Sequence, residues 1–242
     1  AAGIEELIFV TGRNKRSIED HFDKAYELES ELASKQKSEM LELAQNTLPK
    51  HANCIYIRQA QPLGLGHAVL CAEPAVGDEP FAVILADDLI YNDGYGCLAQ
   101  MVSVYETNHC SVVGVQQVKP EEVKNYGIIS GNNFQEDLWD VDTFVEKPNP
   151  TDAPSNIAVV GRYILKPSIF TILSNTNEGV GGEIQLTDAL AAQAQLDKVL
   201  AYQFKGKRYD CGSKLGYLEA TVEYALRHNQ VGAQFKQYLD KF

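Results

Sequence analysis

Four short apolar runs separated by helical stretches constrain the fold of this chain more than any other feature of its sequence. They occupy residues 7–10, 54–57, 81–86 and 111–115. Runs without polar alternation are typical of strands that are covered on both faces, so they predict a parallel or mixed sheet flanked by helices. Their alternation with helical stretches indicates an α/β fold of the doubly wound, Rossmann-like kind.

Helices and a second group of strands complete this picture. Apolar periodicity predicts helices over residues 17–22, 28–44, 67–72, 97–108, 167–173, 183–194 and 214–227. Shorter strands are expected over residues 127–129, 142–145, 157–165 and 199–204. The turn-rich pieces between the first of these short strands predict a small inserted antiparallel portion. No linker or repeat interrupts the chain, and residues 1–242 are therefore expected to form one domain.

The end of the chain carries one apolar stripe. Phe235, Tyr238, Leu239 and Phe242 recur at the spacing of one helix face. Such a stripe normally packs on its own domain. The alternative is a subunit interface, which would make the protein a homo-oligomer, a dimer or a tetramer.

Charge and cysteine content exclude several functional classes. The chain has 21 Lys and Arg against 33 Asp and Glu, a net charge of -12, so nucleic acid is not an expected partner. An anionic substrate would need a few cations, backbone N–H groups or a divalent metal. The five cysteines are odd in number and never spaced C-x-x-C, which predicts a reducing cytoplasm. No apolar run approaches the roughly 20 residues of a membrane span, and no signal peptide is recognisable.

Carboxylates follow the third apolar run. Asp87 and Asp88 stand where a parallel sheet presents its ligands, and strand alternation predicts that only one of them faces the cleft. Asp210 is a second candidate, and two carboxylates with phosphate oxygens suit Mg²⁺. The alternative is that Asp87 and Asp88 only cap a following helix.

A glycine-rich loop follows the second apolar run. Gln59 offers an amide that can pair with the edge of uracil, and Gly64 and Gly66 leave space for a planar base. The loop fails as a dinucleotide fingerprint because the third glycine is absent. A plain glycine-rich turn is the alternative.

Further polar residues could hold a sugar phosphate. Glu146 can accept hydrogen bonds from sugar hydroxyls, and Lys147 supplies a positive charge for a phosphate. A surface ion pair without function is the alternative. Gly127 permits close backbone approach, and Glu183 is either a hydroxyl acceptor or an acid in a first helical turn. No P-loop or nucleophile motif is present, and the histidines, His67 included, are expected to be structural.

Six motifs occur in the order found in one enzyme family. They are Gly64-Leu65-Gly66-His67-Ala68 with Gln59 before it, Leu85-Ala86-Asp87-Asp88, Tyr126-Gly127-Ile128-Ile129, Val145-Glu146-Lys147-Pro148, Gly182-Glu183-Ile184-Gln185-Leu186-Thr187-Asp188 and Tyr209-Asp210-Cys211-Gly212. From end to end the chain resembles bacterial UTP:glucose-1-phosphate uridylyltransferases. The charged helix from Phe22 to Leu43 resembles one that separates this family from the thymidylyltransferases.

The resemblance implies a fold and an activity. The fold would be the GT-A-like sheet of sugar nucleotidyltransferases, with the antiparallel insertion facing the sugar. The partners would be UTP, glucose 1-phosphate and the product UDP-glucose, made with Mg²⁺ and without a protein nucleophile. Alternatives are a thymidylyltransferase that uses dTTP and a catalytically inactive module that binds sugar nucleotides.

The resemblance also implies roles for individual residues. Gln59 and Gly64 would hold uracil, and Asp87 and Asp210 would hold the metal. On the sugar side, Gly127 and Glu146 would hold glucose, Lys147 would face the sugar phosphate, and Glu183 would be a further sugar-side residue. Asp87 and Lys147 would be the catalytic residues.

One part of the family pattern is absent. The G-x-G-T-R loop that would wrap the triphosphate, and the P-K-E-M segment after it, do not occur in this sequence. We therefore expect the natural polypeptide to continue upstream by one βα unit, on the order of 30 residues.

Overall fold

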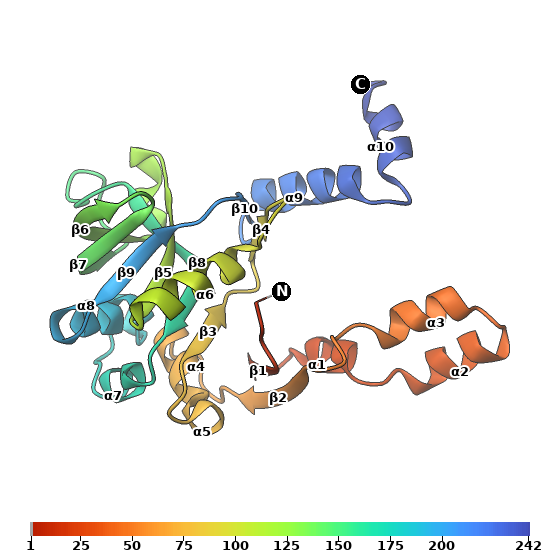
Figure 1. The fold of residues 1–242 in the computed structure, drawn as a ribbon, viewed down its shortest axis with the longest axis horizontal. Helices are drawn as coiled ribbons and strands as arrows, with labels where there is room; N and C mark the ends of the chain where they lie inside the picture. The colour runs from red at the N-terminus through yellow and green to blue at the C-terminus, as the bar shows by residue number, and fades with distance from the viewer. Residues whose placement is uncertain (1) are drawn as a thin grey trace. The chain divides into compact units, whose positions relative to one another are not determined.

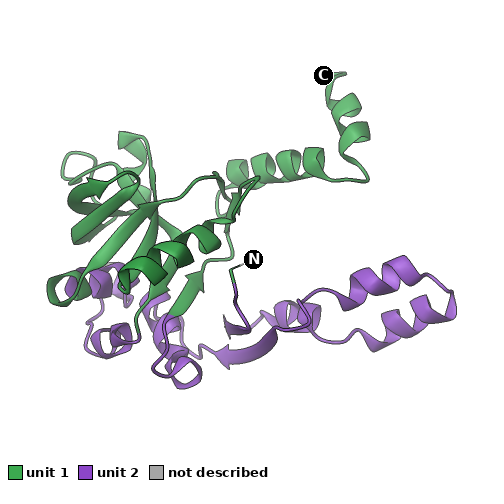
Figure 2. Ribbon diagram, viewed as in Figure 1, with its two compact units in different colours: residues 1–2, 81–166, 193–242 green, residues 3–80, 167–192 purple. Residues whose placement is uncertain are grey.

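The computed structural model describes residues 2–242, which form two compact units (Figure 2). Unit 1 contains residues 81–166 and 193–242 together with Ala2, and unit 2 contains residues 3–80 and 167–192. The assignment of residues 1–242 to one domain stays a prediction. Within the described residues, no helix has the length and apolar character needed to cross a membrane.

Unit 1 is built on a six-stranded mixed sheet with the order β3-β8-β5-β9-β7-β6 (Figure 1). Its strands are β3 (Phe81–Ile84), β5 (Ser111–Gln117), β6 (Gly127–Gln135), β7 (Leu138–Glu146), β8 (Ile157–Leu165) and β9 (Val199–Gln203). β5 and β9 run parallel, and the other neighbours run antiparallel. β6 also pairs with β8 through Ile128 and Ala158. The predicted mixed sheet and its antiparallel portion are confirmed.

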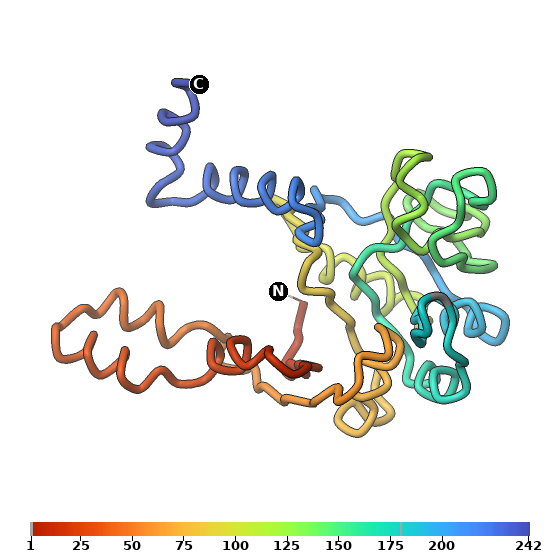
Figure 3. The backbone as a smooth tube through the Cα atoms, turned by 180° about the vertical axis from the view of Figure 1, so that it is seen from behind, coloured from red at the N-terminus to blue at the C-terminus, as the bar shows by residue number. Residues whose placement is uncertain are grey.

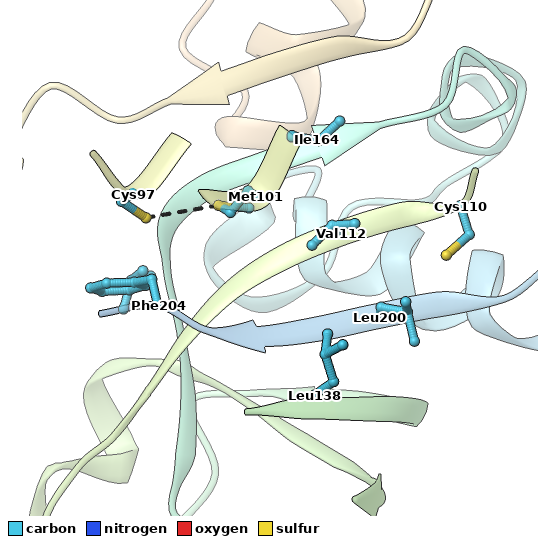
Figure 4. Packing of buried hydrophobic residues seen from close by; sticks show 9 residues of the cluster. Cys97, Met101, Cys110, Val112, Leu138, Ile164, Leu200 and Phe204 are labelled. Atoms are coloured by element: carbon cyan, nitrogen blue, oxygen red, sulfur yellow. Dashed lines mark hydrogen bonds between the residues drawn. The ribbon is translucent and has the colours of Figure 1, made fainter. Parts of the chain in front are cut away.

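The core of unit 1 lies where α6 (Cys97–Asn108) packs on β5 and β8. Met101 of α6 is fully buried, as is Val112, the second residue of β5 (Figure 4). The predicted helix over residues 97–108 is confirmed. Burial raises the pKa of the Cys97 thiol to about 12, so this cysteine is a packing residue and not a nucleophile.

A small antiparallel pair that the sequence did not predict stands next to the carboxylates. β4 (Asp88–Tyr91) pairs with β10 (Lys207–Asp210), and the register sets Asp88 opposite Asp210. Both strands have only four residues, β10 is mostly polar, and β4 has just three apolar residues after Asp88, so neither contains an apolar run as long as the four that mark the predicted sheet. The remaining elements of unit 1 are the 3₁₀ helix η1 (Pro120–Asn125), α9 (Lys214–Arg227) and α10 (Gly232–Leu239).

The C-terminal stripe does not pack into the core of its own unit, contrary to the first of its two interpretations. Tyr238 is 53% exposed and Phe242, which lies beyond the end of α10, is 93% exposed. The rings of Phe235, Tyr238 and Phe242 contact one another instead, with centroid separations of 6.4 and 5.2 Å. α10 packs on α9, and within the stripe Phe235 and Leu239 are half-buried.

Unit 2 begins with two parallel strands, β1 (Glu6–Thr11) and β2 (Asn53–Arg58), which pair along their whole length. Figure 3 traces the backbone between them, from red near the N-terminus to orange. Phe9 of β1 stacks between Phe22 and Tyr56, at centroid separations of 4.9 and 5.5 Å. Its helices are α1 (Arg16–Phe22), α2 (Tyr26–Ser34), α3 (Ser38–Gln45), α4 (Leu65–Cys71), α5 (Glu73–Val76), α7 (Ser168–Ser174) and the 3₁₀ helix η2 (Val180–Gly182). α8 (Leu186–Leu196) begins in unit 2 and ends in unit 1.

The single helix predicted over residues 28–44 is wrong, because two helices, α2 and α3, occupy this segment. α2 ends in a left-handed cap in which Gln36 has φ +53° and the Lys37 N–H donates to the Leu32 carbonyl. Glycine or asparagine normally marks such a cap, and neither stands here. The apolar periodicity therefore continues across the break between α2 and α3, and no glycine or asparagine marks that break.

Candidate active site

The first of three candidate clusters lies in unit 2, at the end of β2. The Gln59 N–H donates to the Thr11 carbonyl at 2.9 Å, which extends the β1–β2 ladder by one residue and fixes the Gln59 backbone. The Gln59 side chain turns toward the glycine-rich loop. Its Nε2 atom lies 3.1 Å from the Gly64 carbonyl oxygen and 2.9 Å from His67 Nδ1. The predicted uracil residues Gln59 and Gly64 are therefore in direct contact.

The glycine-rich loop is held by a segment that is distant in the sequence. Ile184 N–H donates to the Leu63 carbonyl at 2.8 Å, and the Ile184 carbonyl accepts from Gly66 N–H at 2.9 Å. Gly64 has φ +96°, and a Cβ added there would lie 2.7 Å from Glu183 Cβ. Glycine is required at this position because the loop and the segment approach so closely. The space beside Gly64, where the sequence predicts room for a planar base, is thus partly occupied by Glu183.

Glu183 is not in a first helical turn, and that interpretation is wrong. The predicted helix over residues 183–194 begins only at Leu186, and Glu183 is extended, with φ -110° and ψ 148°. Pairing of Ile184 with the loop holds this backbone extended. The exposed Glu183 carboxylate accepts from Gln185 Nε2 at 3.3 Å. Glu183 therefore lies beside Gly64, and its sugar-side role stays a prediction.

The second cluster, in unit 1, contains the carboxylates of Asp87 and Asp210. The Asp87 carbonyl accepts from Cys211 N–H at 2.8 Å, and Asp210 Oδ1 accepts from Gly212 N–H at 3.0 Å. A Cβ on Gly212 would lie 3.1 Å from Asp210 Oδ1 and 3.3 Å from Asp87 Oδ2. Oxygens of the two carboxylates therefore border one space that the absent side chain leaves open.

That space suits a hard divalent cation. Among residues 2–242 no group of three or more His, Cys, Asp or Glu side chains could hold a metal ion. Two carboxylates alone match the needs of Mg²⁺, which keeps several waters and takes other oxygens from substrate phosphates. The donor set therefore fits Mg²⁺, or the similarly oxygen-seeking Mn²⁺, better than Zn²⁺ or Cu²⁺, which would favour nitrogen or sulfur ligands.

Asp88 differs sharply from its neighbour Asp87. Asp87 is exposed, whereas Asp88 is 5% exposed and forms an ion pair with Arg208. Asp88 Oδ2 also accepts from Gly161 N–H at 2.6 Å. Of the two carboxylates only that of Asp87 is exposed, as strand alternation predicts, and whether it faces a substrate cleft stays a prediction. Helix capping is wrong for both, because the segment continues directly into strand β4.

Arg208 pairs with Asp88 and also lies close to Tyr126, which precedes Gly127, and to Asp210. Its guanidinium lies 5.2 Å from the centroid of the Tyr126 ring and 3.8 Å from Asp210 Oδ2. Burial alone would lower the pKa of Arg208, but the hydrogen bond to Tyr126 and the Asp88 carboxylate offset this and raise it. The guanidinium is therefore charged and held between these partners.

A second arginine holds the turn that carries Asp87. Arg162 donates to the carbonyls of Leu85 and Asp88, at 3.1 and 2.5 Å. Burial lowers the pKa of Arg162. The exposed Asp87 thus stands on a turn whose two ends are tied to β8, which limits the freedom of its carboxylate.

The third cluster, also in unit 1, contains Gly127, Glu146 and Lys147. Gly127 opens β6 directly opposite Glu146, the last residue of β7, and Lys147 N–H donates to the Tyr126 carbonyl at 3.0 Å. Lys147 has φ +46°, an uncommon conformation for lysine. Its Nζ lies 3.4 Å from Glu146 Oε1, and its side chain is 53% exposed. This open ion pair is weak and leaves the ammonium accessible to a phosphate.

Arg208 and Tyr126 were not singled out from the sequence as separate functional residues. Arg208 directly precedes Tyr209-Asp210 and Tyr126 directly precedes Gly127. Their adjacency to motif residues was the only available signal, because their contacts depend on the unforeseen β4–β10 pair. His67 was expected to be structural, and its contact with Gln59 brings it to the first cluster.

Comparison with known proteins assigns the chain to a family. The nucleotidyl transferase family model matches residues 1–227. The chain is 52% identical to UTP–glucose-1-phosphate uridylyltransferase of Pseudomonas aeruginosa over 221 residues, 91% of this chain and 79% of that protein. A crystal structure of UDP-glucose pyrophosphorylase complexed with UDP-glucose matches with a TM-score of 0.84 and 48% identity, covering 94% of this chain and 83% of the other.

A second solved structure agrees. The UTP-bound UDP-glucose pyrophosphorylase from Acinetobacter baumannii matches with a TM-score of 0.90 and 42% identity, over 98% of this chain and 83% of that chain. The resemblance noted in the sequence is thus confirmed over nearly the whole chain. This protein belongs to the nucleotidyl transferase family and, within it, to the UTP–glucose-1-phosphate uridylyltransferases.

Proposed function

We propose that this protein transfers the uridylyl group of UTP to α-D-glucose 1-phosphate, giving UDP-glucose and pyrophosphate. The observation that carries the proposal is the high identity to named uridylyltransferases over nearly the whole chain. The three clusters supply the matching chemistry: an amide for a base, carboxylates for a metal, and a lysine beside a carboxylate for a sugar phosphate.

The reaction needs positioning and charge neutralisation more than a protein nucleophile. A phosphate oxygen of glucose 1-phosphate attacks the α-phosphorus of UTP, the new P–O bond forms, and the bond to the leaving pyrophosphate breaks. The exposed ammonium of Lys147 would hold the attacking phosphate, and Glu146 would accept hydrogen bonds from glucose hydroxyls. Gly127, opposite Glu146, would let the sugar approach the backbone of β6.

The carboxylates of Asp87 and Asp210 are the proposed ligands of Mg²⁺. When bound, Mg²⁺ would neutralise charge on the triphosphate. Asp87 is presented by the turn that Arg162 ties to β8, and Asp210 by the end of β10. Gly212 keeps the space between them free of a side chain.

The nucleotide would be recognised in unit 2. Gln59 and Gly64 would hold uracil, since the Gln59 amide already touches the loop that carries Gly64. A close alternative is the use of dTTP, because thymine presents the same hydrogen-bonding edge as uracil. An inactive module that binds sugar nucleotides is the alternative from another class.

Two assays on the full-length protein test the proposal. Release of pyrophosphate from UTP and glucose 1-phosphate, compared with dTTP at equal concentration, should favour UTP. Calorimetric titration with UDP-glucose measures binding separately. Binding without pyrophosphate release would identify an inactive module, and preferential turnover of dTTP would identify a thymidylyltransferase.

We also propose an assembly and a location for this protein. It would be a cytoplasmic homo-oligomer, in which the exposed rings of Tyr238 and Phe242 contribute to a subunit interface. Light scattering during gel filtration measures the order of assembly, and a monomeric mass at micromolar concentration would reject it.

A further inference from the structure

The side-chain amide of Gln59 can have only one orientation. One of its terminal atoms lies 3.1 Å from the Gly64 carbonyl oxygen. A carbonyl oxygen only accepts hydrogen bonds, so the atom facing it must be the NH₂ group. The reversed amide would bring two acceptor oxygens together. The loop therefore fixes Gln59 with its NH₂ group inward, toward Gly64.

The same contact determines the tautomer of His67. The Gln59 NH₂ group also lies 2.9 Å from His67 Nδ1, and an amide nitrogen has protons to give but no lone pair to accept with. His67 Nδ1 must therefore be the acceptor. The ring proton of His67 consequently resides on Nε2. Both protons of the Gln59 amide are then used, one by Gly64 and one by His67.

The side-chain oxygen of Gln59, Oε1, takes no part in these two hydrogen bonds. In the described part of the chain, no residue donates a hydrogen bond to Gln59 Oε1. Gln59 is only partly buried, so this oxygen can meet a ligand. The first cluster thus presents one acceptor of fixed direction, whereas a free glutamine could turn either an acceptor or a donor outward.

We propose that His67 is a specificity-determining residue, which selects uracil over cytosine by fixing the Gln59 amide. The inference rests on the proposed function, in which Gln59 meets the base. Uracil carries a proton on N3 and can donate to Gln59 Oε1. Cytosine has a bare lone pair on N3, which would face the same oxygen without a proton between them. A site whose polar group is left unpaired rejects the wrong base.

The loop geometry supports a fixed amide. Gly64 and His67 both belong to the turn from the loop into α4, so their two acceptors move together. The pairing of Ile184 with Leu63 and Gly66 holds this turn from the other side. Cys71, one helical turn after His67, lies 3.9 Å from both ring nitrogens and packs against the ring. His67 is therefore placed by its surroundings and not by the Gln59 contact alone.

Three variants of the full-length protein test the proposal. His67→Leu keeps bulk but removes the acceptor, His67→Asn retains an acceptor oxygen near the position of Nδ1, and His51→Leu alters an exposed histidine as a control. We expect His67→Leu to raise KM for UTP and to narrow the preference for UTP over CTP roughly tenfold, with kcat and KM for glucose 1-phosphate little changed. His67→Asn should restore most of the preference.

A direct measurement of the tautomer does not depend on activity. Long-range ¹H–¹⁵N spectra distinguish a protonated from an unprotonated Nδ1, and comparison with His67→Asn assigns the signals. We expect an unprotonated Nδ1 in His67. A protonated Nδ1 would overturn the inference, even if His67→Leu failed to fold.

The two possible failures can be told apart. A wild-type protein that does not consume UTP would refute the proposed function. A wild-type protein that consumes UTP, with His67→Leu folded and equally selective against CTP, would refute only the role of His67.

Discussion

The Gln59 loop of unit 2 and the Asp88–Arg208 pair of unit 1 fix candidate residues by opposite means. Gln59 is held by neutral hydrogen bonds to Gly64 and His67. Asp87 and Asp210 are supported by charged groups, since the buried Asp88 carboxylate pairs with Arg208, which also approaches Asp210. The first arrangement orients a pattern of donors and acceptors, and the second places negative charge.

The difference has energetic consequences. A neutral hydrogen bond at a partly exposed site contributes little to stability, so its loss should change selectivity and leave the fold intact. The side chains of Asp88 and Arg208 are 6% and 8% exposed, so removal of one leaves the charge of the other buried without its partner. We therefore expect substitutions in unit 1 to affect stability and rate, and those at Gln59 and His67 to affect base preference.

The largest expected effect is that of Arg208→Gln. It should lower the free energy of unfolding by about 3–5 kcal/mol, because the Asp88 carboxylate would be buried unpaired. Urea unfolding measures this change. The exposed pair between Lys198 and Asp140, 3.8 Å apart, offers a matched control, and Lys198→Gln should cost less than about 1 kcal/mol.

A double variant tests the assignment to Asp88. Arg208→Gln combined with Asp88→Asn should recover part of the lost stability, since no charge would remain buried. Equal instability of the single and double variants would mean that Arg208 acts through Tyr126 or Asp210 instead.

The next largest effect concerns the exposed carboxylates. Asp87→Asn or Asp210→Asn should lower kcat about 10²–10³-fold, in the range found when one charge-stabilising group is removed from an active site. Thermal unfolding should barely change, because Asp87 is exposed and Asp210 is only partly buried.

Metal binding provides the independent readout for these variants. Mn²⁺ titration followed by electron paramagnetic resonance should show weaker binding in both. The exposed Asp78→Asn serves as the control. Unchanged Mn²⁺ affinity and turnover in both variants would reject the metal assignment.

The strands, and most helices, were predictable because their apolar runs and periodicity are local properties. β5 and α6 lie where the sequence predicts them. The break between α2 and α3 was not predictable, because Gln36 adopts a left-handed conformation without glycine or asparagine. The β4–β10 pair was missed because its strands have only four residues each and β10 is mostly polar, and the two strands are joined by long-range contacts such as that of Asp88 with Arg208.

In the candidate site, too, long-range contacts could not be predicted from the sequence. The family resemblance implies that Asp87 and Asp210 would hold a metal ion, and the structure brings their oxygens to one space beside Gly212. The sequence could not show that Glu183 lies against Gly64, because residues 64 and 183 meet only through the backbone pairing of Leu63 with Ile184. His67 likewise became a candidate only through its contact with Gln59.

A smaller effect is expected for Lys147, which belongs neither to the Gln59–His67 hydrogen bonds nor to the Asp88–Arg208 pair. Lys147→Ala should raise KM for glucose 1-phosphate roughly tenfold and KM for UTP much less, since its ammonium would hold only the attacking phosphate. Initial rates with each substrate varied in turn measure both constants. The exposed Lys124→Ala is the control, and equal losses for the two substrates would refute the role.

The smallest expected effect is that of Glu223→Gln. It tests whether burial, and not charge alone, makes the Asp88–Arg208 pair important for stability. Glu223 of α9 is also surrounded by donors, namely Lys207, the Tyr209 hydroxyl at 2.7 Å and Arg227 at 2.9 Å, but its side chain is 28% exposed, far more than that of Asp88. These hydrogen bonds lower the pKa of Glu223 from 4.5 to about 2. Because the folded state binds this proton less tightly than the unfolded state, the stabilisation is complete above pH 4.5 and is lost as the pH falls toward 2.

Glu223→Gln should therefore be slightly less stable than the wild type at pH 7, and the difference should disappear between pH 4.5 and about 2. Urea unfolding at a series of pH values measures it, with Glu219→Gln, an exposed residue one turn earlier in α9, as the control. Solvent screens an exposed network, so the loss at pH 7 should be far below that of Arg208→Gln. A comparable loss, or one independent of pH, would show that charge itself stabilises unit 1 wherever it lies.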